Sequence, residues 1–157
     1  MSGFRRGVRL GVDVGKARVG VARCDPDGML AVPVETIART DATIDRLTEL
    51  VEEYAPVEFV VGLPVNMRGE DTASTADARS FAVQLRARTA VPVRLIDERL
   101  STVSAHSALR ASGRTQKNSR NIVDQVAAVV LLQQAIDMEK STGHPAGTSV
   151  DLDEETN

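Results

Sequence analysis

The chain has 157 residues, of which 42% are hydrophobic and 26% are charged, as is usual for a globular protein with one sizeable core. No apolar run approaches the ~20 residues that span a bilayer. Charges and glycines interrupt the N-terminal segment, so no secretory signal is predicted. The single cysteine, Cys24, agrees with a reducing compartment and excludes an internal disulfide, while leaving a bridge between two chains open. These features predict a cytoplasmic protein with no membrane partner.

The net charge of −3 is located at the C-terminus, because residues 140–157 hold one lysine against four acidic side chains and the rest of the chain sums to zero. Two other stretches are basic. Residues 1–24 carry six Lys or Arg against Asp13 alone, and residues 99–123 carry five with no acid. Such stretches suit a polyanionic partner such as nucleic acid, although solvated faces of ordinary helices and hairpins would explain them equally well.

Three strands are predicted at the start of the chain, over residues 8–14, 18–24 and 31–37. The first alternates, with valines and a leucine on one face and Arg9, Gly11 and Asp13 on the other. The turn between the first two strands, GKA, is short, so these strands should form an antiparallel hairpin. The turn sequence DPDG precedes the third strand.

The remainder of the chain alternates between helices and strands. Helices are predicted at residues 41–54, 72–88, 101–112 and 119–139, and strands at residues 57–64 and 91–98. Asp71 is a candidate N-cap for the second helix, and the centre of the last helix, VAAVVLL, is apolar all round, as in a buried helix. Residues 113–119 are predicted to form a mobile loop, and residues 140–157 a disordered acidic tail.

The predicted element order is therefore β-β-β-α-β-α-β-α-α. It indicates an α/β fold with a mixed five-stranded sheet, whose first three strands form an antiparallel meander and whose faces are flanked by helices. No internal repeat or linker interrupts the order, so residues 1–139 are predicted to form one domain.

Carboxylates from distant parts of the chain are predicted to converge. Asp13 lies on the first strand, and Asp97 and Glu98 lie at the C-terminal end of the fifth, where ligands of open α/β sheets collect. Asp124 shares the apolar stripe of the last helix and so projects towards the sheet. Each has an ordinary structural explanation as well: Asp13 as an arginine partner, Asp97 as a helix cap, and Asp124 as a charge near a helix N-terminus.

Taken together, three inward carboxylates among basic residues suit a hard cation such as Mg²⁺ or Mn²⁺. Two such ions, about 3.5–4 Å apart, can activate a water and stabilise the leaving oxygen of a phosphodiester. A zinc site is not predicted, because Cys24, His106 and His144 have no ligand spacing.

Four segments, in this order, resemble the YqgF family, also called RuvX, whose members are described as Holliday junction resolvases and associated with pre-16S rRNA processing. They are GVDVGKARVGVA at 11–22, VVGLPVNMRGED at 60–71, DERLSTVSAHSAL at 97–109 and NIVDQVAAVVLLQQAID at 121–137. The likeness covers residues 7–139 and implies an RNase H-like fold. It further implies that Asp13, Glu98 and Asp124 are the metal-binding, catalytic carboxylates, with Asp13 bridging two ions, and it selects Glu98 over Asp97.

Polar and basic side chains around these carboxylates are expected to bind the nucleic-acid backbone. The candidates from the matched segments and from the second basic stretch are Lys16, Arg18, Asn66, Arg68, Arg99, Arg110, Arg114, Lys117 and Arg120.

The expected function is thus a divalent-metal-dependent nuclease acting on pre-16S rRNA, branched DNA, or both. Cleavage of a four-way junction needs two symmetric cuts and therefore a homodimer, whereas RNA trimming does not. Two alternatives stay open. One is an ATPase of the actin and sugar-kinase type, which has a similar glycine-rich hairpin but needs two such domains. The other is a non-catalytic nucleic-acid-binding or transcription-related protein on the same scaffold.

Overall fold

A six-stranded mixed sheet runs through the computed structural model, which describes residues 4–97 and 116–150, and for residues 116–122 the backbone alone. Its spatial order is β3-β2-β1-β4-β5-β6. In chain order the strands are β1 (Arg9–Val14), β2 (Arg18–Cys24), β3 (Ala31–Ala38), β4 (Glu58–Leu63), β5 (Val93–Asp97) and β6 (Thr148–Ser149). The first three form the predicted antiparallel meander, β4 and β5 continue the sheet parallel to β1, and β6 is antiparallel to β5.

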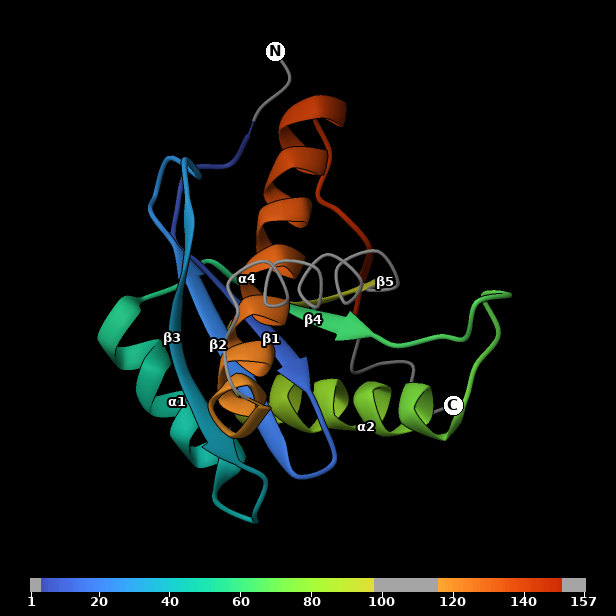
Figure 1. Cartoon of the computed structure of the whole chain (residues 1–157). Coiled ribbons are helices and arrows are strands. Elements are labelled where there is room, and N and C mark those ends of the chain that lie inside the picture. Colours follow the sequence, from blue (N-terminus) through green and yellow to red (C-terminus); the bar gives the residue numbers. More distant parts are fainter. Residues whose placement is uncertain (1–3, 98–115, 151–157) are drawn as a thin grey trace.

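Helices cover both faces of this sheet (Figure 1). They are α1 (Thr43–Tyr54), α2 (Ala73–Arg88) and α4 (Gln116–Thr142). Helices α1 and α2 pack on one face, over a core that includes Val12, Val61 and Phe81. Helix α4 packs on the other face, over β1, β2 and β3, around Ala128 and Leu132. No helix in the described ranges is both long enough and apolar enough to cross a membrane.

Alternation along the strands explains the two-sided core. In β2, the valines at 19 and 21 belong to the α1–α2 side, whereas Ala22 and Cys24 belong to the α4 side. Strand β4 is buried over nearly its whole length, as its continuous apolar sequence predicts for a central parallel strand. The face of β1 that carries Arg9, Gly11 and Asp13 is therefore not open to solvent but lies under α4.

The structure differs from the sequence predictions at several element ends. Thr72, not Asp71, caps α2, in a reciprocal capping box with Thr75. Helix α4 begins at Gln116, inside the predicted loop, and continues to Thr142. It is buried along one stripe rather than all round, because Val129 and Val130 line an open groove beside Leu30. The predicted helix at 101–112 lies outside the described residues.

The prediction of a disordered tail is wrong for residues 140–150. Strand β6 pairs with Leu95 and its neighbour Arg94, so the sheet has six strands rather than five. The Arg94 guanidinium donates hydrogen bonds to the carbonyls of Ala146 (2.7 Å) and Gly147 (2.8 Å). Val150 is buried in the α1–α2 core, and its N–H donates to the Val93 carbonyl. Burial and hydrogen bonds therefore hold this segment in place. The polar and acidic sequence of the C-terminus does not reveal these contacts.

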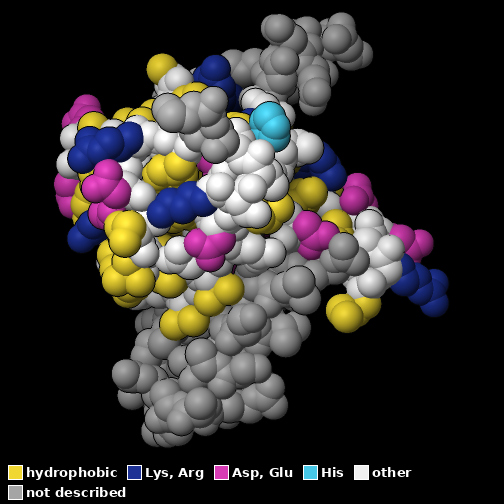
Figure 2. All heavy atoms as spheres, turned by 90° about the horizontal axis from the view of Figure 1, so that it is seen from above, with side chains coloured by type: hydrophobic (Ala, Val, Ile, Leu, Met, Phe, Trp, Pro, Cys, Tyr) yellow, Lys and Arg dark blue, Asp and Glu magenta, His cyan; other side chains and the backbone are white. Residues whose placement is uncertain are grey.

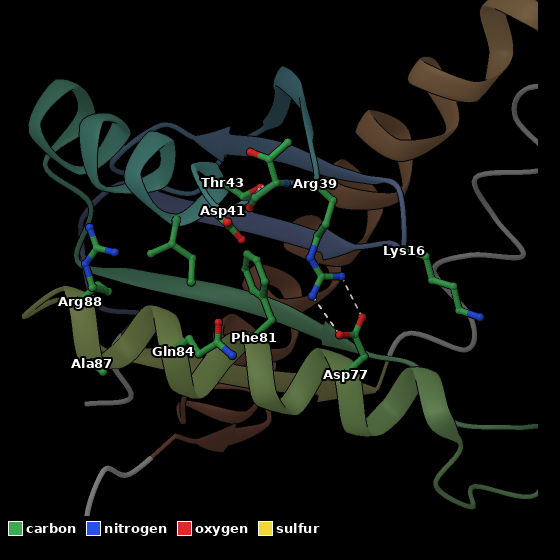
Figure 3. Close-up of a pocket in the computed structure, with 11 residues that line it drawn as sticks. Lys16, Arg39, Asp41, Thr43, Asp77, Phe81, Gln84, Ala87 and Arg88 are labelled. Atoms are coloured by element: carbon green, nitrogen blue, oxygen red, sulfur yellow. Dashed lines mark hydrogen bonds and ion pairs between the residues drawn. The ribbon is translucent and has the colours of Figure 1, made fainter.

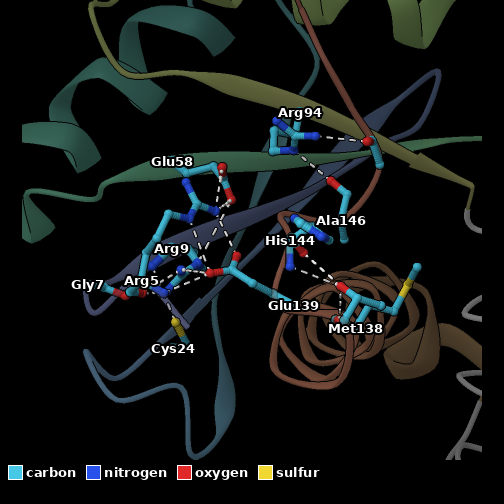
Figure 4. A network of polar contacts seen from close by, with 12 residues as sticks. Arg5, Gly7, Arg9, Cys24, Glu58, Arg94, Met138, Glu139, His144 and Ala146 are labelled. Atoms are coloured by element: carbon cyan, nitrogen blue, oxygen red, sulfur yellow. Dashed lines mark hydrogen bonds and ion pairs between the residues drawn. The ribbon is translucent and has the colours of Figure 1, made fainter. Parts of the chain in front are cut away.

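A buried ionic network joins the N-terminal segment, β4 and the end of α4 (Figure 4). Arg9 is only 1% exposed, and its Nη2 lies 3.1 Å from Glu139 Oε2. Arg5 donates to both Glu58 and Glu139, at 3.1 and 2.7 Å. Burial by itself would raise the pKa of Glu139, but hydrogen bonds from Arg5 and the charge of Arg9 outweigh burial and hold this pKa below its ordinary value.

Four of the six basic residues in residues 1–24 are engaged with other side chains of the protein. Arg5 and Arg9 belong to the buried network, Arg6 pairs with Asp27 at 2.9 Å, and Arg23 lies over the Tyr54 ring. Acidic and basic side chains are interspersed where α4 ends, rather than gathered by sign (Figure 2). Lys16 and Arg18, in and after the β1–β2 turn, lie at the other end of the sheet.

Candidate active site

Two of the three predicted carboxylates lie on the same face of the sheet. Asp13 is directly opposite Gly20 in the antiparallel β1–β2 ladder. Opposite residues in such a ladder point to one face. A Cβ atom on Gly20 would overlap the main-chain carbonyl of Asp124, which places α4 immediately above this pair. Asp13 therefore points into the layer that holds Asp124, as predicted.

Glycine is required here for close approach, not for an unusual backbone angle. Gly11 and Gly20 face α4, and a Cβ on Gly11 would lie 2.9 Å from Leu132 Cβ and 3.0 Å from the Ala128 carbonyl. With a side chain at either glycine, α4 would lie farther from the sheet, and Asp124 would lie farther from Asp13. The sequence contains the signal, since glycines alternate with valines along both strands, which puts Gly11 and Gly20 on the face of Asp13.

Arg18 makes an ion pair with Asp124. Its Nε lies 2.7 Å from Asp124 Oδ2, with side chains that are 36% and 16% exposed. Arg18 and Gly20 are two residues apart in β2 and so share the face under α4. The predicted phosphate contact Arg18 is thus engaged with a predicted metal ligand.

The third predicted carboxylate, Glu98, lies outside the described residues, directly after the end of β5. Strands β1, β4 and β5 are parallel, so their C-terminal ends lie at one edge of the sheet. Asp97 is the neighbour of Glu98 that the sequence also offers. It is two residues beyond Leu95 in β5, so both residues point to the face of the sheet that α1 and α2 cover. That face is opposite to the one that carries Asp13, which argues against Asp97 as a partner of Asp13 and Asp124.

The donor set fits a hard divalent cation. Asp13 and Asp124 supply carboxylate oxygens on one side of the sheet, and oxygen is what Mg²⁺ and Mn²⁺ prefer. Within residues 4–97 and 123–150, no group of three or more His, Cys, Asp or Glu side chains comes together. A metal site with three protein ligands therefore requires a side chain from outside these two ranges. Glu98 is the ligand predicted for this position.

Lys16, a second predicted phosphate contact, is placed elsewhere. It lines a pocket of about 860 Å³ between α1 and α2, at the end opposite Arg88 (Figure 3). In this pocket Arg39 donates two hydrogen bonds to Asp77, at 2.8 and 2.9 Å. These bonds hold the pKa of Asp77 below its ordinary value, and the charge of Lys16 lowers it further. Lys16 and Arg18 thus emerge from one hairpin towards opposite faces of the sheet.

The loop between β4 and α2 is held in shape by Asn66. Its Oδ1 accepts hydrogen bonds from the N–H groups of Arg68 and Glu70, both at 2.9 Å, and its Nδ2 donates to Glu70. Buried Thr75 donates its hydroxyl to the Pro64 carbonyl at the base of the loop. Met67, which is 84% exposed, and Arg68 stand at its tip. Asn66 therefore organises the loop, while Arg68 remains available for a phosphate.

The structure describes the other predicted nucleic-acid contacts only in part. Lys117 and Arg120 are on the first turns of α4, where the backbone alone is described. Arg99, Arg110 and Arg114 lie outside the described residues.

Comparison with solved structures identifies the fold. The chain is similar to RuvC of T. thermophilus in complex with a Holliday junction substrate, with a TM-score of 0.56 over 91% of this chain and 99% of that chain, at 16% identity. A second structure, "Thermus thermophilus RuvC structure", gives a TM-score of 0.55 over the same coverage. The predicted RNase H-like fold is confirmed, with one strand more than expected.

Sequence comparison defines the family. The model described as "RuvX: Holliday junction resolvase" matches residues 7–138, and the chain belongs to this family. A protein of Leifsonia xyli named "Putative pre-16S rRNA nuclease" is 53% identical over 94% of this chain and 97% of its own length. A protein of the same name from Streptomyces avermitilis is 51% identical over 96% and 98%. These findings confirm the predicted class, a nuclease.

Proposed function

We propose that this nuclease hydrolyses phosphodiester bonds with two divalent metal ions held by Asp13, Asp124 and Glu98. The observation that carries the proposal is that Asp13 and Asp124 lie on the same side of the sheet, where α4 contacts Gly20 closely. A divalent cation would offset the like charges of carboxylates gathered on this side of the sheet. The pairing of Asp124 with Arg18 supports this, since it places a cation beside one of them.

The carboxylates and the arginines would have different roles in such a reaction. Bound Mg²⁺ or Mn²⁺ would supply an activated water and stabilise the leaving oxygen. Asp13, Asp124 and Glu98 would hold these ions, as the family resemblance implies. Arg18 and Arg68 would bind backbone phosphates, which would help to position the strand.

We propose precursor 16S rRNA as the substrate, in the 5′-end processing that the family resemblance implies. The support is the name shared by relatives that are about half identical to this chain over nearly its full length. We infer that the activity takes place in the cytoplasm, as a step of ribosome biogenesis. The family description supports branched DNA as a second substrate, whose paired cuts require a homodimer.

The direct test uses purified protein with Mg²⁺ on precursor rRNA and on four-way junction DNA. Asp13→Asn and Asp124→Asn should each reduce cleavage about 100-fold or more, because even groups behind metal ligands contribute 10–100-fold. Binding of the same substrates without metal should change little. Cleavage by both variants at the wild-type rate would refute the assignment of these ligands.

The non-catalytic alternative makes the opposite prediction, namely substrate binding that is indifferent to chelators and no cleavage of either substrate. The comparisons give it no support. The ATPase alternative predicts tight ATP binding by calorimetry, which a chain with one such domain should not display.

A further inference from the structure

We propose that Arg18 is an exchangeable counter-ion of Asp124, which occupies this carboxylate until the substrate phosphate draws the guanidinium away and a metal ion takes its place. The inference rests on the proposed function, because it needs Asp124 to be a metal ligand. It adds a form of regulation, in which metal and substrate bind cooperatively through one side chain.

The contact itself is suited to exchange. Arg18 Nε and Asp124 Oδ2 are 2.7 Å apart, so the guanidinium occupies an oxygen that a metal would use. Asp124 is 16% exposed, so its charge is poorly solvated and needs a cation. Arg18 is 36% exposed, so it can reach solvent and a ligand at the surface.

Exchange requires no movement of the main chain. The β1–β2 turn is closed by a hydrogen bond from the Gly15 N–H to the Arg18 carbonyl at 2.9 Å. On the other side, α4 is seated on Gly20 at the carbonyl of Asp124. Both backbones are thus fixed, and the ion pair can be made or broken by rotation of the arginine side chain alone.

Phosphate is the natural alternative partner of this arginine. The guanidinium forms bidentate hydrogen bonds with phosphate as readily as with carboxylate. When substrate takes Arg18, Asp124 loses its cation and gains affinity for a metal. Because coupling between two sites is reciprocal, bound metal must tighten the binding of phosphate by the same factor.

The test is the binding of Mn²⁺, measured by titration calorimetry with no reaction. Arg18→Ala should tighten Mn²⁺ binding to the free protein about 5-fold or more, in the range typical of coupled sites. Arg18→Lys retains the charge and should stay nearer to wild type. Lys16→Ala removes one charge from the same hairpin, but on the α1–α2 side, and should change the affinity less than about 2-fold.

The second arm adds a short phosphorothioate oligonucleotide, which resists hydrolysis. It should tighten Mn²⁺ binding to the wild type and to Lys16→Ala, and this gain should be absent in Arg18→Ala. Circular dichroism confirms that each variant is folded, and Arg18→Gln replaces Arg18→Ala if the latter is not.

The outcomes separate the two proposals. If Asp13→Asn and Asp124→Asn bind Mn²⁺ as the wild type does, the metal site of the proposed function is wrong. If those variants lose Mn²⁺ binding but Arg18→Ala behaves like Lys16→Ala in both arms, the metal site stands and the exchange by Arg18 is overturned.

Discussion

Gly20 and Asp124 are in contact through their backbones, in the space where a side chain at position 20 would lie. Gly20 is also the cross-strand neighbour of Asp13. One missing side chain therefore sets the distance between two carboxylates that are more than a hundred residues apart in the sequence. The closeness of a helix to a sheet, usually a matter of packing, here determines the geometry of a candidate active site.

Replacing Gly20 with alanine should separate these carboxylates. The new methyl group overlaps main-chain atoms, which cannot rotate away, so α4 must lift from the sheet. Overpacking of this kind costs about 1–3 kcal/mol of stability, and we expect cleavage to fall more than about 10-fold. Gly11→Ala, whose methyl group meets α4 at 2.9–3.0 Å, is the graded control and should have the smaller effect on both. Chemical denaturation and cleavage rates measure the two quantities; equal activity of Gly20→Ala and wild type would contradict the prediction.

The buried network at the far end of α4 should make stability depend on pH. Because the pKa of Glu139 is lower in the folded state, its contribution to the free energy of unfolding is complete above its ordinary value and is lost as pH falls through the folded-state value. Glu139→Gln should cost about 3–5 kcal/mol at neutral pH, since it leaves the charges of Arg5 and Arg9 against that of Glu58 in the network. The difference from wild type should shrink in acid.

Urea denaturation at several pH values between about 7 and about 3 measures this difference. The control is Glu49→Gln, which removes an exposed pair with Arg46 and should cost less than about 1 kcal/mol. A Glu139→Gln deficit that stayed constant down to the lowest pH would mean that the carboxylate charge is not what stabilises the network.

Asn66 should determine the rigidity of the β4–α2 loop. Asn66→Ala removes the acceptor for two main-chain N–H groups, including that of Arg68, so the tip should open more often. Limited digestion with trypsin should then cut after Arg68 several times faster. Gln84→Ala, which removes an exposed hydrogen bond to Ser80 on α2, is the control and should leave that rate unchanged.

Residues 144–150 should contribute to stability. If residues 151–157 form the disordered tail that the sequence predicts, removing them should leave the free energy of unfolding unchanged. Removing residues 144–157 also deletes the bonds from Arg94 and the burial of Val150, and burial of one valine alone is worth about 1.5–3 kcal/mol. Thermal unfolding of the two truncated proteins tests this contrast; equal melting temperatures would contradict it.

Cys24 should be inert in the folded protein. Its side chain is fully buried, burial raises the pKa of the thiol, and its Sγ accepts a hydrogen bond from the Arg9 N–H. We expect modification by a thiol reagent to be more than about 1,000-fold slower than in urea, since it must await unfolding. Rapid modification, or a disulfide-linked dimer of folded chains, would contradict this.

Local patterns predicted the elements well because their causes are local. The alternation of valine and glycine defines β1 and β2, and the apolar run of β4 defines a central strand. The patterns placed Asp13 and Asp124 on faces that the structure brings together. Asp71 and Thr72 are both residue types that cap helices, so the sequence does not distinguish them, and the reciprocal bond with Thr75 identifies Thr72 as the cap of α2.

What the sequence did not reveal depends on contacts between distant residues. Arg9 looks like a solvated charge on an alternating strand, yet its buried partner Glu139 is 130 residues away. Arg18 looks like a phosphate ligand, yet it meets Asp124 from 106 residues away. The same applies to residues 144–150. Their polar composition suggests disorder, but Arg94 and the edge of β5, which are distant in the sequence, bind them.

Helix α4 finally relates the stability of one end of the molecule to the chemistry of the other. Asp124 and Glu139 are 15 positions apart on one continuous helix, about 22 Å along its axis. Since the ion pairs of Glu139 fix the helix lengthwise, a slip of one residue there would displace Asp124 by about 1.5 Å and turn it by about 100°. Selection for catalytic geometry would then act on residues that never approach a substrate, and the arginines at the N-terminus would be retained for the alignment of the helix.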